Sequence, residues 1–240
     1  MPKPYRGGQG SMSQSHTGAI LVNDGTAPKA PKNYQQFTDK DAAALISANA
    51  DAYDDPDFIY ARKLYVSDAT DSQGFSFSQN LNYKLDNGIK LNANEQFMAD
   101  MLGNGMREIG KDTVLVRAAH DDILKTLGVK DYTKYSDTQL KQMLVGKQLV
   151  TTSYTSYSYD ESKNPFMPGQ PNGGGREVKM ITKAAANTKM FFGAKSQAEV
   201  VTNVGTNLKI TNVYYDGTRA TPRLRRNSVP RIVIEFEAWG

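Results

Sequence analysis

The sequence predicts an α+β fold, and three observations lead to that prediction. Residues 38–110 place apolar side chains at helical spacing, whereas residues 111–240 break into short β-branched and aromatic runs separated by turn residues. Residues 1–37 are rich in Gly, Ser, Pro, Gln and Lys, with one short apolar patch at 19–22. We therefore expect a flexible N-terminal arm with at most one docking contact, followed by a single domain over 38–240 whose helices come first.

Start signals for helices are clear in the first half of this domain. The sequence Thr-Asp-Lys-Asp at 38–41 predicts a capped helix start, and Asp-Pro at 55–56 predicts another, because proline suits the first helical position. Residues 72–85 are ambiguous, since their first part alternates Phe and Ser like a strand but also suits a loop. A further helix is expected within 94–110, up to the glycines that end it.

The second half of the domain reads as strands joined by turns and two short helices. The helices are expected at 121–128 and 139–146, the second after a Ser-x-x-Gln capping box. A long Pro/Gly/Asn-rich loop covers 160–175, and loops of this length in compact domains are often functional. A basic loop covers 219–230. Strands are predicted at 113–118, 149–159, 177–184, 189–192, 196–204, 207–216 and 231–239.

Composition excludes several kinds of chemistry. The chain of 240 residues has no cysteine, so disulfides, thiolate catalysis and cysteine-based zinc sites are excluded. His16 and His120 are too few for a histidine metal cluster, and no metal is expected. No apolar run reaches the roughly 18 residues of a membrane span, and the N-terminus lacks the apolar core of a Sec signal. The net charge of +4 permits an anionic partner without requiring one.

The stretch Ser-Gln-Ala-Glu-Val-Val at 196–201 is the first candidate for a site. On a strand, Gln197 and Glu199 would project from the same face, two residues apart, while the paired valines anchor the strand in the core. Such a pair can simply face solvent, and for an isolated Gln-x-Glu this is the common case. The alternative is a carboxylate and an amide placed side by side at the centre of an enzyme.

Two further groups upstream bear on this choice. Arg117 interrupts an apolar strand, so its guanidinium needs either a core carboxylate or an anionic ligand such as a phosphate. Thr151, Thr152 and Ser153 place hydroxyls on a predicted strand, where they either satisfy edge backbone groups or orient a neighbouring carboxylate. No histidine or lysine lies nearby in the sequence to activate them, so a hydrolase nucleophile is not supported.

The order and spacing of these groups resemble the arginine–serine–glutamate class of mono-ADP-ribosyltransferases. Within this class the chain is most similar to the clostridial Rho-modifying exoenzymes and to the catalytic domains of binary actin toxins. The layout matches over roughly residues 40–240, and the specific motifs lie within 114–204. The resemblance implies two small, mostly antiparallel sheets packed together, flanked by the N-terminal helices, with NAD between them.

The resemblance also implies contacts with NAD. Arg117 would bind the NAD phosphates, and the backbone at Ala118 would hold the nicotinamide amide. The loop 160–175 matches the segment that closes over the phosphates and nicotinamide in this class. Phe166 and Arg176 are the candidates for its aromatic and basic contacts.

For catalysis, the resemblance implies that Glu199 stabilises the positive charge that develops on the ribose when nicotinamide leaves. Gln197 would orient the acceptor, and glutamine at this position accompanies neutral acceptors such as asparagine, threonine or guanine rather than arginine. The Ser-Thr-Ser triplet of the class maps to Thr151, Thr152 and Ser153. Thr151 departs from the serine that orients the catalytic glutamate, which puts its role in doubt because threonine is stiffer.

The expected partners are NAD and a target protein, with no membrane. Residues 193–199 match the turn that presents the target, and Phe191 or Phe192 is the candidate recognition aromatic. A nucleic-acid acceptor is an alternative, for which the basic loop at 219–230 would be the contact. A non-catalytic protein that keeps only the scaffold is another. The protein is expected in the cytoplasm of the producing or host cell, or delivered by a phage or a non-Sec route.

Overall fold

The structure of the chain is a computed structural model that describes residues 18–22, 34–167, 176–221 and 227–240. The helices are α1 (Asp39–Ala48), α2 (Ala50–Tyr53), α3 (Pro56–Tyr65), α4 (Phe77–Asp86), α5 (Ala93–Asn104), α6 (Asp122–Thr126) and α7 (Asp137–Leu144). The strands are β1 (Ala19–Val22), β2 (Arg107–Glu108), β3 (Thr113–Ala119), β4 (Gln148–Thr151), β5 (Thr155–Ser158), β6 (Val178–Ala184), β7 (Lys189–Phe192), β8 (Glu199–Thr202), β9 (Asn207–Ala220) and β10 (Val229–Trp239).

The strands form a mixed, mostly antiparallel sheet. Their order is β1-β4-β9-β10-β6-β3-β5-β8-β7-β2, and β6 and β10 are the parallel pair. The α+β class is therefore confirmed. The division into two sheets is less complete than predicted, because a six-stranded part and a four-stranded part join in one order. Within the described residues, the ladder between β3 and β5 that joins the two parts consists of the single pair Val116–Ser158.

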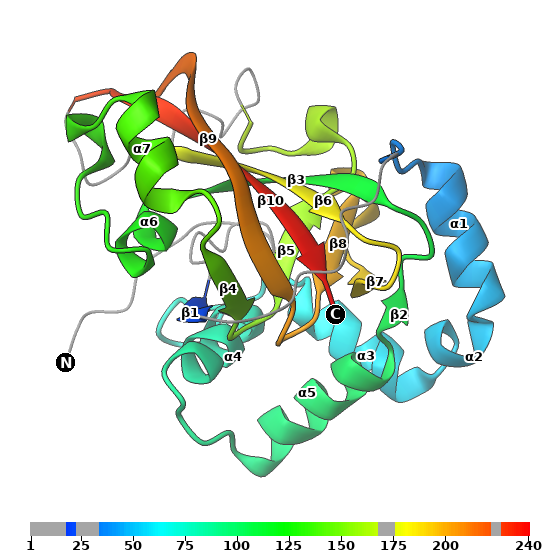
Figure 1. Cartoon of the computed structure of the whole chain (residues 1–240). Coiled ribbons are helices and arrows are strands. Elements are labelled where there is room, and N and C mark those ends of the chain that lie inside the picture. The colour runs from blue at the N-terminus through cyan, green and yellow to red at the C-terminus, as the bar shows by residue number, and fades with distance from the viewer. Residues whose placement is uncertain (1–17, 23–33, 168–175, 222–226) are drawn as a thin grey trace.

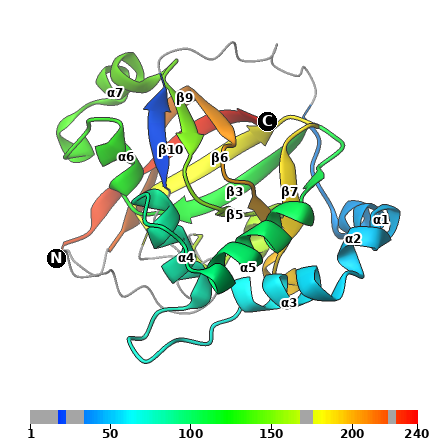
Figure 2. The same cartoon turned by 90° about the horizontal axis from the view of Figure 1, so that it is seen from below.

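The helices of the first half lie along one side of the sheet, and α6 and α7 lie at its other end (Figure 1). Seen from below, α3, α4 and α5 cover the face of the sheet behind them (Figure 2). Helix α3 contacts both α4 and α5, so these three helices act as one layer. Their apolar side chains, including Tyr65, Leu81 and Leu102, are fully buried in the main core. The helical layer thereby supports the four-stranded part of the sheet from below.

The predicted helix starts are confirmed by their capping bonds. Thr38 and Asp41 form a reciprocal capping box, and the Asp55 carboxylate accepts the first free N–H groups of α3. Ser136 caps α7 in the same way as Thr38 caps α1. The ambiguous stretch 72–85 resolves into a helix, because Ser76 and Gln79 form a capping box at the start of α4. None of the helices in the described ranges is long and apolar enough to span a bilayer.

Several strand predictions need correction. The single strand expected over 149–159 is two strands, since β4 pairs with β1 and β9 whereas β5 pairs with β3 and β8. The apolar patch at 19–22 forms β1, and the rest of the expected N-terminal arm lies largely outside the described residues. The basic loop is shorter than predicted, because β9 extends to Ala220 and β10 begins at Val229.

Candidate active site

Glu199 lies at the end of a tight turn formed by residues 193–199. Its side chain is 1 % exposed, and its Oε2 accepts the N–H of Ala194 at 2.7 Å. The predicted strand over 196–204 is wrong in its first residues, since Gln197 belongs to a short 3₁₀ turn and β8 begins at Glu199. The side chains of Gln197 and Glu199 therefore do not share a strand face, as the alternation of side chains along a strand would have predicted. The turn between them aims Glu199 inward and leaves Gln197 half-buried.

Two serines of β5 share a sheet face with Glu199. Ser158 pairs directly with Glu199 across the β5–β8 ladder, and Ser156 lies two residues away, so all three side chains point to one face. The Ser158 hydroxyl bonds the carbonyl oxygens of Asp160 and Gln197 and thus fixes the turn. In the described part of the chain, the buried Ser156 Oγ has no hydrogen-bond partner. The Ser156 hydroxyl therefore lies on the Glu199 face of β5 with its hydrogen-bonding capacity unused within the described residues.

Arg117 approaches the same strand from β3. Its side chain is 2 % exposed, and its Nη1 donates to the Ser156 carbonyl oxygen at 2.6 Å. Burial lowers the pKa of the Arg117 guanidinium, and the negative charge of Glu199 is among the nearby groups that oppose this shift. The buried arginine and glutamate that the sequence singled out therefore flank one short strand.

A tyrosine that the sequence did not single out faces this pair from the helical layer. Tyr65 of α3 is fully buried, and its hydroxyl accepts a hydrogen bond from Asn82 Nδ2 at 3.2 Å. Asn82 also donates to the Tyr154 carbonyl oxygen at 2.9 Å, which ties α4 to the residue before β5. Burial raises the pKa of Tyr65, and the Glu199 charge adds to this effect. No periodicity or motif in the sequence distinguishes Tyr65 from an ordinary core tyrosine.

The hydroxyls of Thr151 and Thr152 bond other parts of the chain. Thr151 Oγ1 donates to the Asn203 carbonyl oxygen at 3.1 Å and accepts the Thr206 N–H at 3.0 Å. Thr152 Oγ1 donates to Asp86 at 2.7 Å, and Ser153 is buried beyond the end of β4. The assignment of Thr151 as the group that orients Glu199 is therefore wrong. The chain turns between β4 and β5, and this turn separates the triplet from the strand opposite Glu199. The Ser-x-Ser spacing at 156–158 was the signal in the sequence that could have indicated the serines on the same sheet face as Glu199.

Three of the predicted NAD contacts lie together on β3 and the loop that follows β5. Ala118 packs with Val116, Phe166 and Met167 in a small cluster apart from the main core. The Arg176 guanidinium lies 4.6 Å from the centre of the Phe166 ring. Side chains alternate along β3, so this cluster lies on the opposite face of the strand from the Arg117 side chain. Phe166 and Arg176 flank residues 168–175, which lie outside the described residues.

The two candidate recognition aromatics are part of the core. Phe191 is 0 % and Phe192 5 % exposed, and both belong to the main hydrophobic cluster. Phe191 contacts the Tyr65 ring edge-to-face, and Phe192 stacks on Phe37. Neither ring is exposed to a protein partner, so their assignment to target recognition is wrong. Both phenylalanines instead anchor β7, the strand from which the 193–199 turn departs.

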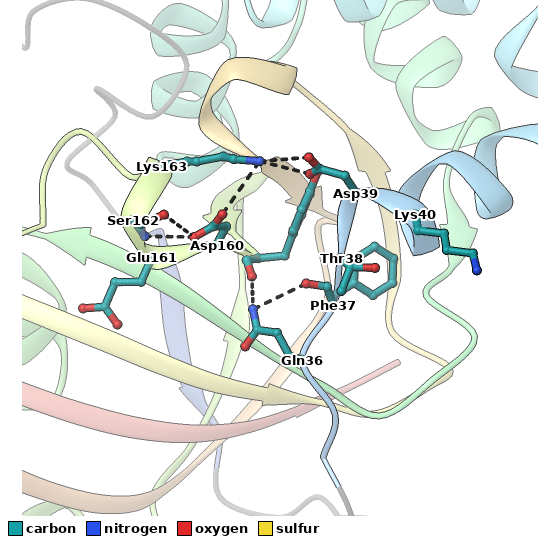
Figure 3. Close-up of a pocket in the computed structure, with 10 residues that line it drawn as sticks. Gln36, Phe37, Thr38, Asp39, Lys40, Asp160, Glu161, Ser162 and Lys163 are labelled. Carbon is teal, nitrogen blue, oxygen red and sulfur yellow. Dashed lines mark hydrogen bonds and ion pairs between the residues drawn. The ribbon is translucent and has the colours of Figure 1, made fainter.

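A cavity of about 600 Å³ lies between the start of α1 and the residues that follow β5. It is lined by Gln36–Lys40 at the start of α1 and by Tyr159–Lys163 after β5, and none of the sequence-predicted site residues lines it (Figure 3). Lys163 bonds Asp39, which also accepts the Tyr159 hydroxyl (Figure 3). These bonds lower the pKa of Asp39. The cavity is close to the turn because the Tyr159 N–H donates to the Ala198 carbonyl oxygen at 3.0 Å.

His120 has a structural partner rather than a metal ligand role. It follows β3, and its Nδ1 lies 2.7 Å from Oε2 of the buried Glu177. Among the residues that the structure describes, no group of three or more His, Cys, Asp or Glu side chains could hold a metal ion.

Comparison of the sequence with known proteins finds no matching protein-family model and no matching curated protein. The fold, however, is similar to several solved structures. An ADP-ribosyltransferase from Clostridium botulinum matches with a TM-score of 0.57 and 16 % identity, over 87 % of this chain and 100 % of that chain. The C3 exoenzyme of Clostridium limosum matches with a TM-score of 0.56 and 16 % identity, over 86 % of this chain and 98 % of that chain.

A larger toxin component has the same fold in part of its chain. The ADP-ribosylating toxin BECa of a binary enterotoxin of C. perfringens, solved with NADH, matches with a TM-score of 0.58 and 14 % identity. The match covers 86 % of this chain but only 50 % of that chain. The fold expected from the order of Arg117, the hydroxyl segment and Glu199 is thus confirmed. The chain has the fold of the clostridial C3-type and binary-toxin mono-ADP-ribosyltransferases.

Proposed function

We propose that the protein is a mono-ADP-ribosyltransferase that transfers ADP-ribose from NAD to a target protein, with slow hydrolysis of NAD alongside. One observation carries this proposal: Arg117 and Glu199, both buried, are brought to the same strand, β5, from its two neighbouring strands. The buried Ser156 hydroxyl of this strand shares a face with Glu199 and has no hydrogen-bond partner within the described residues, which a purely structural strand would not require. The fold shared with known ADP-ribosyltransferases supports the same assignment.

The site residues then have complementary roles toward NAD. Glu199 would stabilise the positive charge on the ribose as the bond to nicotinamide breaks, since a fixed carboxylate in a buried site is most effective there. Arg117 would grip a phosphate through its planar fork. We assign to Ser156 the role predicted for Thr151, namely to orient the carboxylate or the ribose. Ala118, Phe166 and Arg176 are kept as predicted NAD contacts.

Gln197 would meet the acceptor on the target protein. Its Oε1 is buried and has no hydrogen-bond donor within the described residues. An amide side chain can orient an acceptor without adding charge, so we propose a neutral acceptor such as asparagine or threonine. No observation in the described residues favours a nucleic-acid target, because Arg223, Arg225 and Arg226 lie outside them.

The test is release of nicotinamide from NAD by the wild type and by Glu199→Ala. We expect a loss of about 100-fold or more in turnover, whereas Glu108→Ala, which removes an exposed glutamate of β2, keeps wild-type turnover. Equal rates for wild type and Glu199→Ala, or no release by either with candidate targets present, would reject the proposal. A thermal-shift measurement with NAD tests the alternative of a non-catalytic protein that keeps only the scaffold. NAD would not raise the Tm of such a protein, because the protein would not bind it.

A further inference from the structure

The backbone of the 193–199 turn binds the Glu199 carboxylate through one hydrogen bond and is itself closed by two backbone hydrogen bonds. The Ala194 N–H donates to Oε2 at 2.7 Å, the Gly193 N–H donates to the Glu199 carbonyl oxygen at 3.0 Å, and the Glu199 N–H donates to the Ala194 carbonyl oxygen at 3.2 Å. The carboxylate therefore lies directly over the first two residues of the turn.

Glycine at 193 provides the space for this arrangement. A Cβ atom added to Gly193 would lie 2.2 Å from Oε2, 2.5 Å from Cδ and 2.8 Å from Cγ of Glu199. These separations are far below van der Waals contact, so the glutamate side chain would have to move. The backbone of Gly193 is not in the left-handed region. A positive φ is therefore not the reason for glycine here, whereas the nearest atoms to an added Cβ all belong to the Glu199 side chain.

The turn has little freedom to adjust to such a change. Ala198, directly before Glu199, has φ 48° and ψ 41°, and among the described residues it alone combines a side chain with a positive φ. It is fully buried, and its carbonyl oxygen accepts the Tyr159 N–H. A non-glycine residue in this region is strained and persists only where its surroundings enforce it. The contacts around Ala198 therefore hold the turn, and with it Glu199, in one geometry.

We propose that Gly193 is a positioning residue for Glu199, because its missing side chain leaves the space in which the carboxylate is held against the Ala194 N–H. This inference rests on the proposed function, in which the position of the carboxylate determines how well it stabilises charge on the ribose. A displacement of about 1 Å at a reacting group costs on the order of 100-fold in rate. The effect of a side chain at 193 should therefore fall on turnover rather than on NAD binding.

The experiment uses Gly193→Ala with Gly103→Ala as the matched control. Gly103 lies in α5 with open space where its Cβ would be, so Gly103→Ala keeps wild-type kinetics. For Gly193→Ala we expect kcat for nicotinamide release to fall by about ten- to a hundredfold with KM for NAD within about twofold. Wild-type kcat, or a loss confined to KM, would overturn the inference.

A stability cycle gives a second readout that needs no activity. Gly193→Ala should lower the Tm by several degrees in the wild type, because the new Cβ meets the carboxylate. In the Glu199→Ala background the same change should lower the Tm by less than about one degree, since the opposing atoms are gone. Equal decreases in both backgrounds would overturn the inference. If the wild type releases no nicotinamide, the proposed function fails, and the cycle still decides whether Gly193 makes room for Glu199.

Discussion

Two groups of hydroxyl side chains lie within eight residues of each other, and the fold places them differently. Thr151 and Thr152, at the end of β4, bond the 203–206 turn and Asp86. Ser156 and Ser158, in β5, share a face with Glu199. In composition the two groups are alike, and a strand drawn through both would make them equivalent. The difference shows that the strands with which a segment pairs determine whether its hydroxyls bond the surrounding backbone or lie on the same sheet face as Glu199.

The bonds of each group show the same division. Both polar functions of the Thr151 hydroxyl are used, as donor and as acceptor, in bonds to the backbone. The buried Ser156 hydroxyl has no bond within the described residues. Buried polar groups in native proteins are almost always satisfied, and exceptions require an explanation such as a missing ligand. Substitutions that separate activity from stability can therefore test the comparison directly.

Among the changes that test this comparison, the largest loss of activity is expected at Arg117, whose side chain bonds the Ser156 carbonyl oxygen from β3. Arg117→Lys keeps the charge but loses the planar fork, so kcat/KM for nicotinamide release should fall about 100-fold. The measurement is a NAD titration of nicotinamide release, with the Tm recorded to confirm folding. A lysine variant as active as the wild type would show that Arg117 serves only the core.

A smaller effect on activity is expected for Ser156→Ala. Removal of a hydroxyl that has no hydrogen-bond partner among the described residues should leave the free energy of unfolding within about 0.5 kcal/mol of the wild type. Turnover should nevertheless fall about tenfold if the hydroxyl meets the ribose or the carboxylate. Urea unfolding and initial rates of nicotinamide release provide the two values. Unchanged turnover in Ser156→Ala would show that the Ser156 hydroxyl of β5 takes no part in the reaction.

The smallest effect on activity, and the opposite pattern, is expected for Thr151→Val. This change leaves the buried Thr206 N–H without its acceptor, whereas the Asn203 carbonyl oxygen keeps the hydrogen bond from the Thr206 hydroxyl, and it should cost about 1–3 kcal/mol in the free energy of unfolding. Turnover per folded molecule should match the wild type at a temperature well below the Tm. A loss of turnover with normal stability would restore Thr151 to the site and contradict the comparison.

The sequence by itself determined the elements whose signals are local. Capping boxes at Thr38 and Ser136 and the Asp55-Pro56 start identified helices, because these bonds form between residues three or four positions apart. Arg117 could also be selected from the sequence, because a charged residue inside an apolar run is costly to bury without a partner. Glu199 was selected through its place after Arg117 and the hydroxyl segment, since an isolated Gln-x-Glu commonly faces solvent.

Only the tertiary structure decided which residues surround Glu199. The chain turns between β4 and β5, and after this turn Ser156 and Ser158, rather than Thr151, share a sheet face with Glu199. The positions of Tyr65 and Gly193 likewise depend on residues from distant segments or on the closure of a turn. Strand register is set by pairing across the sheet. A shift of a few residues in the strand that pairs with β8 would replace one hydroxyl with another opposite Glu199, and the strand propensity of the local sequence would not reveal the difference. For this reason the sequence could indicate the chemistry of the site, whereas the fold was needed to name its members.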